Sequence, residues 1–396
     1  MGRPTVVRPE EIRRHNLSLV LEQVHRNGEL TRAELTTLLG LNRSTIGDLV
    51  GDLVRRGLVQ ESVPAGGDKA GRPSHVVAPR EDGPYVLAVE VEVQRIVCAA
   101  VGLGGRVHLR RETNTEGPLA NPASAVTQIA RDARWLARRM PANSTLVGVG
   151  VSVPGTVRRA DGLIVHAPNL SWRDVPFGSQ LRERLGAGLE VRIGNNANLG
   201  ALAEHQRGAA RRVRDMIYVV GSIGVGGGVI IDGNELYGAS GYAGEIGHVV
   251  LNPDGPECHC GSNGCVETYI GEHALLRRAG VVGPYGPRDV AKVLADAERG
   301  DAAACAAVQH VAMWLGRTLA ILINIFNPQA IVVGDTLGEI LRLGRPRVDE
   351  EVRRRAMDED RSVVELVAPG LGRDSCLIGA SELAFQHVIA QIADRG

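Results

Sequence analysis

The chain has 396 residues, which is enough to bury the cores of two or three domains. Its 45 basic and 45 acidic residues balance to a formal net charge of zero, so the molecule as a whole is not attracted to a polyanion, and any affinity for DNA must be local. Hydrophobic residues make up 44% of the sequence and aromatic residues only 3%, with 50 glycines, a composition that favours an α/β protein with many tight turns.

The sequence also indicates where in the cell the protein is expected to be. No basic segment leads into an apolar stretch at the start, and no run of apolar residues approaches the roughly 20 that a membrane span needs. The six cysteines suit a reducing compartment, because three form a motif typical of metal sites and the others lie in apolar segments that favour buried free thiols. We therefore expect a cytoplasmic protein with no membrane contact.

The first eighty residues predict a helix-turn-helix. Residues 12–26 carry apolar side chains at helical spacing, and Gly28 follows as a stop. Thr31 and Glu34 then form a capping box, in which each side chain bonds a free amide at the start of the next helix. That helix ends at Gly40, and a further helix begins shortly after it. Two short helices joined by a glycine-containing turn make a helix-turn-helix.

The last of these helices has a narrow outer face with small residues. It begins near Arg43, and its apolar residues recur at i, i+3, i+4 and i+7, so they pack inward. A helix with so little bulk outside can enter the major groove, with Arg43 on phosphate or guanine and Ser44 and Thr45 on phosphate or base edges. The inward-facing residues are Ile46, Leu49, Val50 and Leu53.

A wing follows the helices. Two short strands, residues 58–62 and 75–78, flank a loop rich in Gly, Asp and Lys. In this loop the Gly-Arg-Pro sequence at 71–73 resembles the minor-groove segment of AT-hook proteins, so Arg72 would suit a narrow A·T minor groove. Residues 1–80 contain 12 Lys or Arg against 9 Asp or Glu, which permits DNA binding without requiring it. The alternative is a module for dimerisation or packing alone.

A candidate zinc site lies much later in the chain. Cys258, Cys260 and Cys265 have C-x-C-x4-C spacing, and His248 precedes the first of them by ten residues. Thiolate and imidazole are the ligands that tetrahedral Zn2+ prefers, and a Cys3His set with no spare ligand describes a closed, structural site. The alternative is three unpaired thiols in a loop.

Two carboxylates, Glu245 and Glu267, lie just outside these ligands, so a bound zinc would hold both towards one pocket. The pattern E-x-G-H followed by G-x-x-C-x-C-G-x-x-G-C-x-E closely resembles the zinc motif of the ROK family (repressors, open reading frames, kinases). Its members are sugar kinases or sugar-responsive transcriptional regulators. Every fixed position of the pattern is occupied here.

The N-terminal segment resembles the winged helix of ROK repressors, through LTRAEL, GLNRSTIGDLV, LVRRGLV and GRP. We also expect Arg32, in the first of these segments, to contact DNA. One departure is Gly47, where such helices more often carry Ser or Thr. The missing side chain should remove a contact and loosen the helix slightly.

From Tyr85 onward, strands and helices alternate. This pattern looks like the two-lobed α/β fold shared by actin, ribonuclease H and sugar kinases. We expect a winged helix-turn-helix domain at 1–80 and a sugar-binding domain at 81–396. The small lobe would cover about 84–194 together with the C-terminal helix, and the large lobe about 195–378. Sugar is expected in the cleft between the lobes.

Four segments resemble the sugar pocket of the family. Gly155 in VSVPGTV would bring backbone close to the ligand, and His248 would bind sugar through one ring nitrogen and zinc through the other. Amides and acceptors in such number match the hydroxyls of a pyranose or pentose. Ordinary capping or surface roles are the alternative for the two glutamates. The expected sugar contacts are Gly155, Asn195, Asn196, Glu245, His248 and Glu267.

Two differences from ROK kinases argue against an enzyme. Those kinases carry Asn-Asp where this chain has Asn195 and Asn196, and an amide cannot take the proton of a sugar hydroxyl. Their phosphate-loop pattern D-x-G-G-T-K falls on residues 90–95, where Glu92 replaces a glycine and would repel ATP. A second glycine-rich segment, residues 221–228, survives, but such a run is weak evidence by itself.

The sequence therefore predicts a sugar-responsive transcriptional regulator, most often a repressor in this family, with structural zinc. It would bind a palindromic, A·T-flanked operator as a homodimer, with a tetramer as the alternative, and lie on the nucleoid when DNA-bound. Sugar would close the cleft and change the spacing of two winged helices. The rival hypotheses are a DNA-binding sugar kinase and a regulator that binds no sugar and uses this domain only to dimerise or dock another protein.

Overall fold

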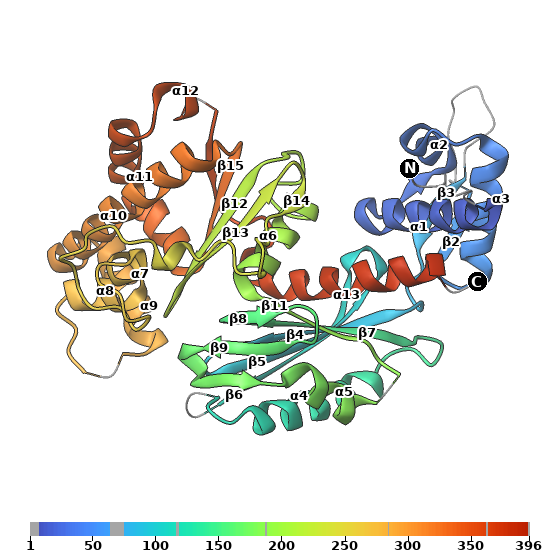
Figure 1. Ribbon diagram of the computed structural model, residues 1–396, viewed down its shortest axis with the longest axis horizontal. Helices are drawn as coiled ribbons and strands as arrows, with labels where there is room; N and C mark the ends of the chain where they lie inside the picture. Colours follow the sequence, from blue (N-terminus) through green and yellow to red (C-terminus); the bar gives the residue numbers. More distant parts are fainter. Residues whose placement is uncertain are drawn as a thin grey trace, which may run out of the picture. The chain divides into compact units, whose positions relative to one another are not determined.

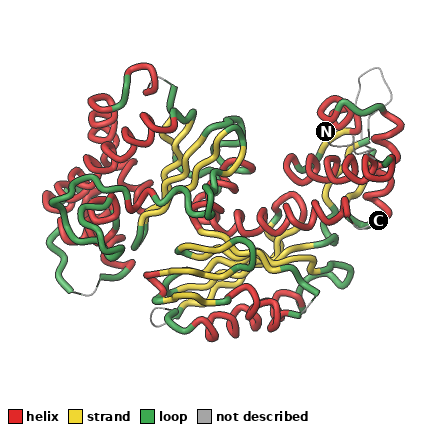
Figure 2. Tube along the Cα trace, viewed as in Figure 1, coloured by secondary structure: helices red, strands yellow, loops and turns green. Residues whose placement is uncertain are grey.

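The computed structural model describes residues 8–63, 75–115, 119–186, 188–283, 285–361 and 363–394. The chain divides into two compact units, which are described one at a time (Figures 1 and 2). Unit 1 comprises Met1–Ser152, Pro176–Ile193 and Ala380–Gly396, and unit 2 comprises Val153–Val175 and Gly194–Gly379.

The predicted winged helix-turn-helix is present in unit 1. The capping box that begins the second helix is confirmed, since the Glu34 amide donates to Thr31 Oγ1 at 3.1 Å and the Thr31 amide donates to the Glu34 carboxylate at 2.7 Å. Gly40 ends this helix with a φ of 64°. The helices are α1 (Pro9–Asn27), α2 (Arg32–Leu39) and α3 (Arg43–Arg55).

A small sheet with strand order β1-β3-β2 completes this domain. The loop between β2 and β3 corresponds to the predicted wing, and its Arg72 lies outside the described residues. The strands are β1 (Leu30–Thr31), β2 (Val59–Ser62) and β3 (Val76–Pro79).

Apolar packing and one ion pair hold α3 against α1. The four α3 residues predicted to face inward are all buried. Arg13 of α1 also pairs with Asp52 of α3, at 3.0 Å between Nη1 and Oδ2. Burial raises the pKa of Asp52, but Arg13 and Arg56 together outweigh it and lower the pKa overall. The outer face of α3 is therefore presented by a fixed helix.

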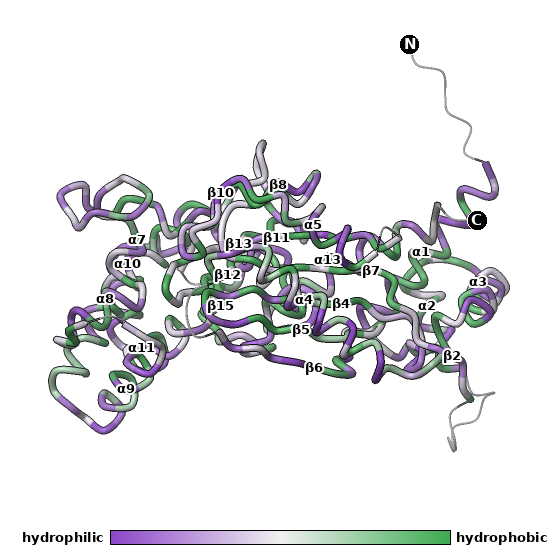
Figure 3. The backbone as a smooth tube through the Cα atoms, turned by 90° about the horizontal axis from the view of Figure 1, so that it is seen from below, coloured by the Kyte–Doolittle hydropathy of each residue, from purple (hydrophilic) through white to green (hydrophobic). Residues whose placement is uncertain are grey.

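A five-stranded sheet with order β11-β7-β4-β5-β6 forms the rest of unit 1. The pairs β4–β5 and β5–β6 are antiparallel, whereas β4 and β7 run parallel. Strand β4 is buried along its whole length, and the edge strand β6 is mostly hydrophilic (Figure 3). Helices α4 and α5 cover one face and α13 covers the other (Figure 1). The elements are β4 (Tyr85–Val91), β5 (Arg95–Gly102), η1 (Leu103–Gly105), β6 (Val107–Asn114), α4 (Pro122–Ala137), β7 (Leu146–Val153), α5 (Phe177–Leu185), β11 (Val191–Asn195) and α13 (Ser375–Asp394).

Helix α13 sits directly on the backbone of β7. A Cβ added at Gly150 would lie 1.8 Å from the carbonyl oxygen of Ala380 and 3.3 Å from the Cβ of Ala384. Gly148, two residues earlier on the same face of the strand, faces Val388 and Ala384. Glycine at position 150 is therefore required by the close approach of the helix.

Unit 2 contains a second five-stranded sheet of the same topology, with order β14-β13-β12-β15-β16. The pairs β12–β13 and β13–β14 are antiparallel, and β12–β15 and β15–β16 are parallel. Helix α6 packs on one face, and α10 and α11 enclose a large apolar core on the other. Repetition of this topology confirms the ribonuclease-H-like fold expected from the sequence. The elements are α6 (Asn196–Gln206), β12 (Met216–Gly221), β13 (Val225–Ile231), β14 (Asn234–Glu235), α8 (Glu272–Arg278), α9 (Pro287–Glu298), α10 (Ala302–Phe326), β15 (Ala330–Gly334), α11 (Asp335–Arg355), α12 (Asp358–Arg361), β16 (Glu365–Val367) and η4 (Gly372–Asp374).

A separate three-stranded sheet, with order β10-β9-β8, also belongs to unit 2. Both of its strand pairs are antiparallel. Its hairpin and the turn that follows bring Gly155 and Asn169 into the same unit as α6 and the cysteine motif. The elements are β8 (Thr156–Arg158), β9 (Leu163–Ala167), η2 (Pro168–Leu170) and β10 (Trp172–Val175).

Helix α10 is the one helix in the described part of the chain that is long and apolar enough to cross a membrane. No such segment is expected from the sequence, since no uninterrupted apolar run approaches the roughly 20 residues that a span needs. Most of the helix is buried inside the protein, and Leu315, Leu319 and Ile323 lie in the apolar core of unit 2. Its hydropathy is that of a central core helix.

Replacing Gly150 with Ala should destabilise the protein, because the added Cβ forces α13 or the backbone of β7 to move. Overpacking of this kind costs about 1–3 kcal/mol, and we expect a loss of that order in the free energy of unfolding, measured by urea denaturation and circular dichroism. Gly188→Ala is the control, since Gly188 is exposed and a Cβ there would have nothing within 4 Å. Equal stability of the two variants would contradict the close seating of α13.

Candidate functional site

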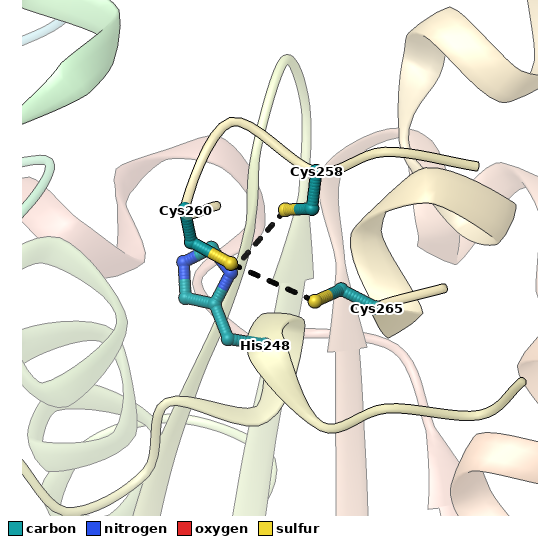
Figure 4. Close-up of side chains that lie close together, drawn as sticks. All are labelled: His248, Cys258, Cys260 and Cys265. Carbon is teal, nitrogen blue, oxygen red and sulfur yellow. Dashed lines mark hydrogen bonds between the residues drawn. The ribbon is translucent and has the colours of Figure 1, made fainter. Parts of the chain in front are cut away.

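Four side chains suited to a metal come together in unit 2, as the sequence predicts. His248 lies in η3 (Ile246–His248), and the three cysteines lie in the loop that leads into α7 (Val266–Ile270). His248 Nδ1 is 3.7 Å from Cys258 Sγ, and Cys260 Sγ is 3.7 Å from Cys265 Sγ (Figure 4). All four ligand atoms lie within 4.8 Å of one another. We call these four residues the zinc set.

The geometry of the zinc set fits a tetrahedral Zn2+ ion. With Zn–S bonds of about 2.3 Å, two sulfur ligands of a tetrahedron are about 3.8 Å apart, which is close to the 3.7 Å between Cys260 and Cys265. Burial, together with hydrogen bonds to Cys260 and Cys258, raises the pKa of Cys265 to about 12. A cation bound beside this thiol would favour its ionised form. Four protein ligands would fill the coordination shell of such an ion, an arrangement typical of structural rather than catalytic zinc sites.

Backbone contacts place the cysteine loop next to η3. The Val266 amide donates to Val249 O at 2.9 Å, and the Leu251 amide donates to Gly264 O at 2.8 Å. Gly264 has a φ of 66°, and a Cβ there would lie 1.6 Å from the carbonyl oxygen of Asn252. Only glycine fits at this position, which gives a physical reason for one fixed glycine of the motif.

Glu267 lies beside the zinc set and already has two partners. The Val225 amide donates to Oε2 at 2.9 Å, and His259 Nδ1 lies 2.9 Å from Oε1. The His259 ring also meets the His248 ring edge-on, with centroids 5.4 Å apart. Cys258, His259 and Glu267 are grouped closely enough to hold a metal, but they share Cys258 with the complete zinc set. His259 could not be singled out from the sequence, because its position is only the spacer residue between Cys258 and Cys260.

Glu245 reaches the same region from the start of η3. Its side chain still meets solvent, but burial of the carboxyl group raises its pKa; His248 opposes this shift and the nearby Glu267 adds to it. The adjoining Gly247 packs so tightly that a Cβ would lie 2.1 Å from Val225 O. Two carboxylates and one imidazole therefore lie within electrostatic range of one another beside the zinc set.

Asn195 caps α6 and joins it to Gly155. Its Oδ1 accepts hydrogen bonds from the amides of Ala197 at 2.9 Å and Asn198 at 3.3 Å, and its Nδ2 donates to Gly155 O at 2.9 Å. Two of the residues predicted to bind sugar are thus bonded to each other. Capping uses the Asn195 oxygen and leaves one Nδ2 hydrogen for a ligand. Asn196 follows as the first residue of α6.

Asn169 is a further polar residue of this region that the sequence analysis missed. A Cβ added at Gly224 would lie 2.9 Å from Glu267 Oε2 and 3.1 Å from Asn169 Nδ2. The amide and the carboxylate therefore border the same small space next to Gly224. No spacing or charge pattern distinguishes Pro168-Asn169-Leu170 in the sequence, so only the folded position identifies Asn169.

The two residues that argue against phosphoryl transfer lie in different units. In unit 1, Glu92 follows β4 and forms an ion pair with Arg95, with Nε and Oε2 at 3.1 Å. Arg95 offsets the charge of Glu92, so the missing glycines are a stronger argument against phosphate binding than repulsion is. In unit 2, the Asn196 Oδ1 accepts from the Ala197 amide at 3.0 Å.

The candidate DNA-binding face is the N-terminal end of α3. Arg43 and Ser44 are exposed and Thr45 is half-buried. Asn42, which the sequence analysis did not name as a cap, accepts a hydrogen bond from the Thr45 amide at 2.8 Å, and Ser44 Oγ donates to the same Asn42 oxygen at 2.7 Å. The Ser44 hydroxyl is thus free to accept, and Arg43 projects the one positive charge of the first turn.

Arg32 has a second role within the domain. It pairs with Glu61 of β2, with Nη2 and Oε2 at 2.7 Å. Its Nη1 lies only 3.3 Å from the place of a Cβ at Gly47, so glycine at that position leaves room for the arginine. Gly47, which stands where such helices more often carry Ser or Thr, therefore provides the space that the Arg32 side chain occupies. A contact of Arg32 with phosphate would have to share the guanidinium with Glu61.

Comparisons with known proteins agree with this architecture. The pattern of the ROK family matches residues 86–387, and that of the MarR family matches residues 18–70. The xylose repressor of Bacillus spizizenii is 30% identical over 381 residues, which cover 96% of this chain and 97% of the repressor. The glucokinase of Halalkalibacterium halodurans is 33% identical over 258 residues, which cover 62% of this chain and 78% of the kinase.

A solved structure shows the same fold over the whole chain. It is a ROK family transcriptional regulator described as a homolog of the Escherichia coli Mlc protein, with a TM-score of 0.80 at 22% identity, covering 98% of this chain and 100% of that one. The protein belongs to the ROK family. Within that family, its N-terminal part is a helix-turn-helix of the MarR type.

Replacing Cys260 with Ser should remove the metal, because a neutral hydroxyl is a far weaker zinc ligand than a thiolate. We expect about one zinc per chain in the wild type and at most about a tenth of that in the variant, measured by inductively coupled plasma mass spectrometry. Cys305→Ser is the control, because Cys305 only donates to Ala297 O at 3.3 Å and serine can do the same. Full zinc content in Cys260→Ser would exclude the proposed ligand set.

Proposed function

We propose that this protein is a sugar-responsive transcriptional regulator, acting as a repressor. The observation that carries the proposal is the presence in one chain of a winged helix with an exposed α3 end and, beside the zinc set, several polar side chains that could bind hydroxyls. The similarity to a xylose repressor extends over 96% of the chain, whereas the similarity to a glucokinase extends over 62%.

In this proposal, zinc on His248 Nδ1 fixes the ring so that Nε2 faces the sugar. The carboxylates of Glu245 and Glu267 accept from hydroxyls, and Asn195 donates its remaining Nδ2 hydrogen. Donors and acceptors interspersed in this way suit a pyranose or pentose. The proposed sugar contacts are Gly155, Asn169, Asn195, Asn196, Glu245, His248 and Glu267.

The proposed DNA contacts lie on the winged helix. Arg43 would bind phosphate or guanine in the major groove, with Ser44 and Thr45 beside it and Arg72 in an A·T-rich minor groove. A two-fold homodimer would place two α3 helices on the halves of a palindromic operator, and a tetramer would pair two such dimers. Such a protein works in the cytoplasm, on the nucleoid when DNA-bound.

The same pocket should bind sugar without phosphorylating it. Asn196 offers an amide where transfer to a hydroxyl needs a base, and residues 90–95 lack the glycines that admit phosphate close to the backbone. Zinc with four protein ligands has no open position for catalysis. The surviving glycine-rich segment at 221–228 keeps a DNA-binding sugar kinase as the second candidate.

Operator binding across a sugar panel tests the proposal. We expect the protein to retard its own upstream DNA in a gel-shift assay at fixed salt, and at least one pentose or hexose to change the operator Kd about 5- to 150-fold. Arg43→Ala should weaken DNA binding, whereas Arg288→Ala on α9, with the same loss of charge, should not. A panel in which no sugar alters the operator Kd or the melting temperature would favour the regulator that binds no sugar.

A kinase assay distinguishes the proposed regulator from the second candidate, a DNA-binding sugar kinase. With the sugar found above, magnesium and ATP, we expect no sugar phosphate and no ADP beyond the background without protein. Clear turnover would contradict the assignment of Asn196 as a binding residue and make the protein a DNA-binding kinase.

Glu267→Gln should weaken sugar binding about tenfold or more, because it replaces a charge-assisted hydrogen bond with a neutral one. Isothermal titration calorimetry with the active sugar measures the change. Glu257→Gln is the matched control, since Glu257 is an exposed carboxylate in the same loop. Equal sugar affinity in both variants would remove Glu267 from the pocket, and zinc content confirms that both proteins are intact.

A further inference from the structure

Helix α6, which carries the candidate sugar residues Asn195 and Asn196 at its start, is attached to α13 through a buried carboxylate. Glu204, near the other end of α6, is fully buried. Its Oε1 accepts from Ser375 Oγ at 2.7 Å and from the Leu371 amide at 3.0 Å, and its Oε2 accepts from the Gly370 amide at 2.8 Å. Ser375 is the first residue of α13. One carboxylate thus binds the start of α13 to the helix of the sugar pocket.

The two helices also touch along their backbones in unit 2. A Cβ added at Gly379 would lie 1.9 Å from the carbonyl oxygen of Leu199 on α6. Because no side chain separates them, a shift of α6 displaces the first turn of α13 directly. Helix α13 continues without a break from Ser375 to Asp394, and its residues from Ala380 onward belong to unit 1.

In unit 1, α13 is bonded to the winged helix at a second buried pair. Glu382 Oε2 lies 2.9 Å from His25 Nε2 on α1, and both side chains are at most 3% exposed. The Gly104 amide donates to His25 Nδ1 at 3.1 Å, so Nε2 carries the hydrogen that is donated to Glu382. The ring of Phe385, on the next turn of α13, packs on His25 with centroids 4.6 Å apart.

We propose that α13 is the element that couples the sugar pocket to the winged helix, with Glu204 as its attachment on the sugar side and the His25–Glu382 hydrogen bond as its attachment on the DNA side. The proposal rests on the proposed function and adds the route of its regulation. His25 and Glu382 are positioning residues that touch neither ligand. Breaking this buried hydrogen bond weakens the attachment of α1 to α13, so the two equilibria become less tightly linked.

The experiment compares three constants in full-length variants: the sugar Kd, the operator Kd and the operator Kd with saturating sugar. In His25→Gln and in Glu382→Gln we expect the sugar Kd within about twofold of wild type and operator binding retained, while the effect of sugar on the operator Kd falls to about twofold or less. The double variant should be no worse than either single variant, because both changes weaken the same contact by removing the charge or the ring geometry that strengthens it.

His387→Gln is the matched control. His387 lies on the same helix in unit 1 and contacts Arg192 and Gln391, neither of which belongs to the winged helix. We expect this variant to keep the wild-type response to sugar. A full sugar response in both His25→Gln and Glu382→Gln, or an equal loss in His387→Gln, would overturn the proposal.

A readout without sugar or DNA separates this proposal from the proposed function. In Glu204→Gln, the new NH2 group faces backbone amides that need an acceptor, so the start of α13 should loosen. If α13 carries this change to the winged helix, the rate of amide hydrogen exchange in α1 residues 17–25 should rise severalfold. The same change in a His25→Gln background should add nothing at α1. If no sugar affects the wild-type operator Kd, the proposed function fails, and this exchange measurement alone decides the coupling. Unchanged exchange at α1 in Glu204→Gln overturns it.

Discussion

The zinc set is the constraint on which the candidate pocket depends. It joins His248 of η3 to a cysteine loop that has little regular structure of its own, and α7 with Glu267 begins directly after Cys265. A zinc ion held by these thiolate and imidazole ligands would convert that loop into a rigid frame. In the proposed function, Glu245 and Glu267, which flank the ligands in the sequence, are then held at a fixed distance from the His248 ring.

In the proposed function, a pocket held in this way recognises hydroxyls without reacting with them. Its carboxylates are acceptors already partly engaged, Glu267 by Val225 and His259, so a sugar has to exchange or share existing hydrogen bonds. Recognition of this kind would shift the elements that carry the proposed pocket. Helix α6 is the one that matters most, because Asn195 starts it and Glu204 ties it to α13. A sugar that binds more tightly to one position of α6 would thus shift the protein towards that position.

The sequence was sufficient for the zinc set and the capping of α2, because both depend on local spacing: C-x-C-x4-C, and Thr31 with Glu34. The fold could be predicted from the alternation of strands and helices together with the resemblance to the ROK family. It was insufficient where partners are distant in the chain. Asn169, the His259–Glu267 contact and the His25–Glu382 pair join segments whose proximity only tertiary packing creates. The role of Gly47 as space for Arg32 is of the same kind, since neither residue predicts the other.

Removal and return of zinc tests the central claim most directly. Protein stripped with a chelator under reducing conditions should lose measurable sugar binding by calorimetry while its winged helix still retards operator DNA, and adding one equivalent of Zn2+ should restore the sugar Kd. Sugar affinity that is unchanged in zinc-free protein would contradict the account, because Glu245, His248 and Glu267 would then be positioned without the metal.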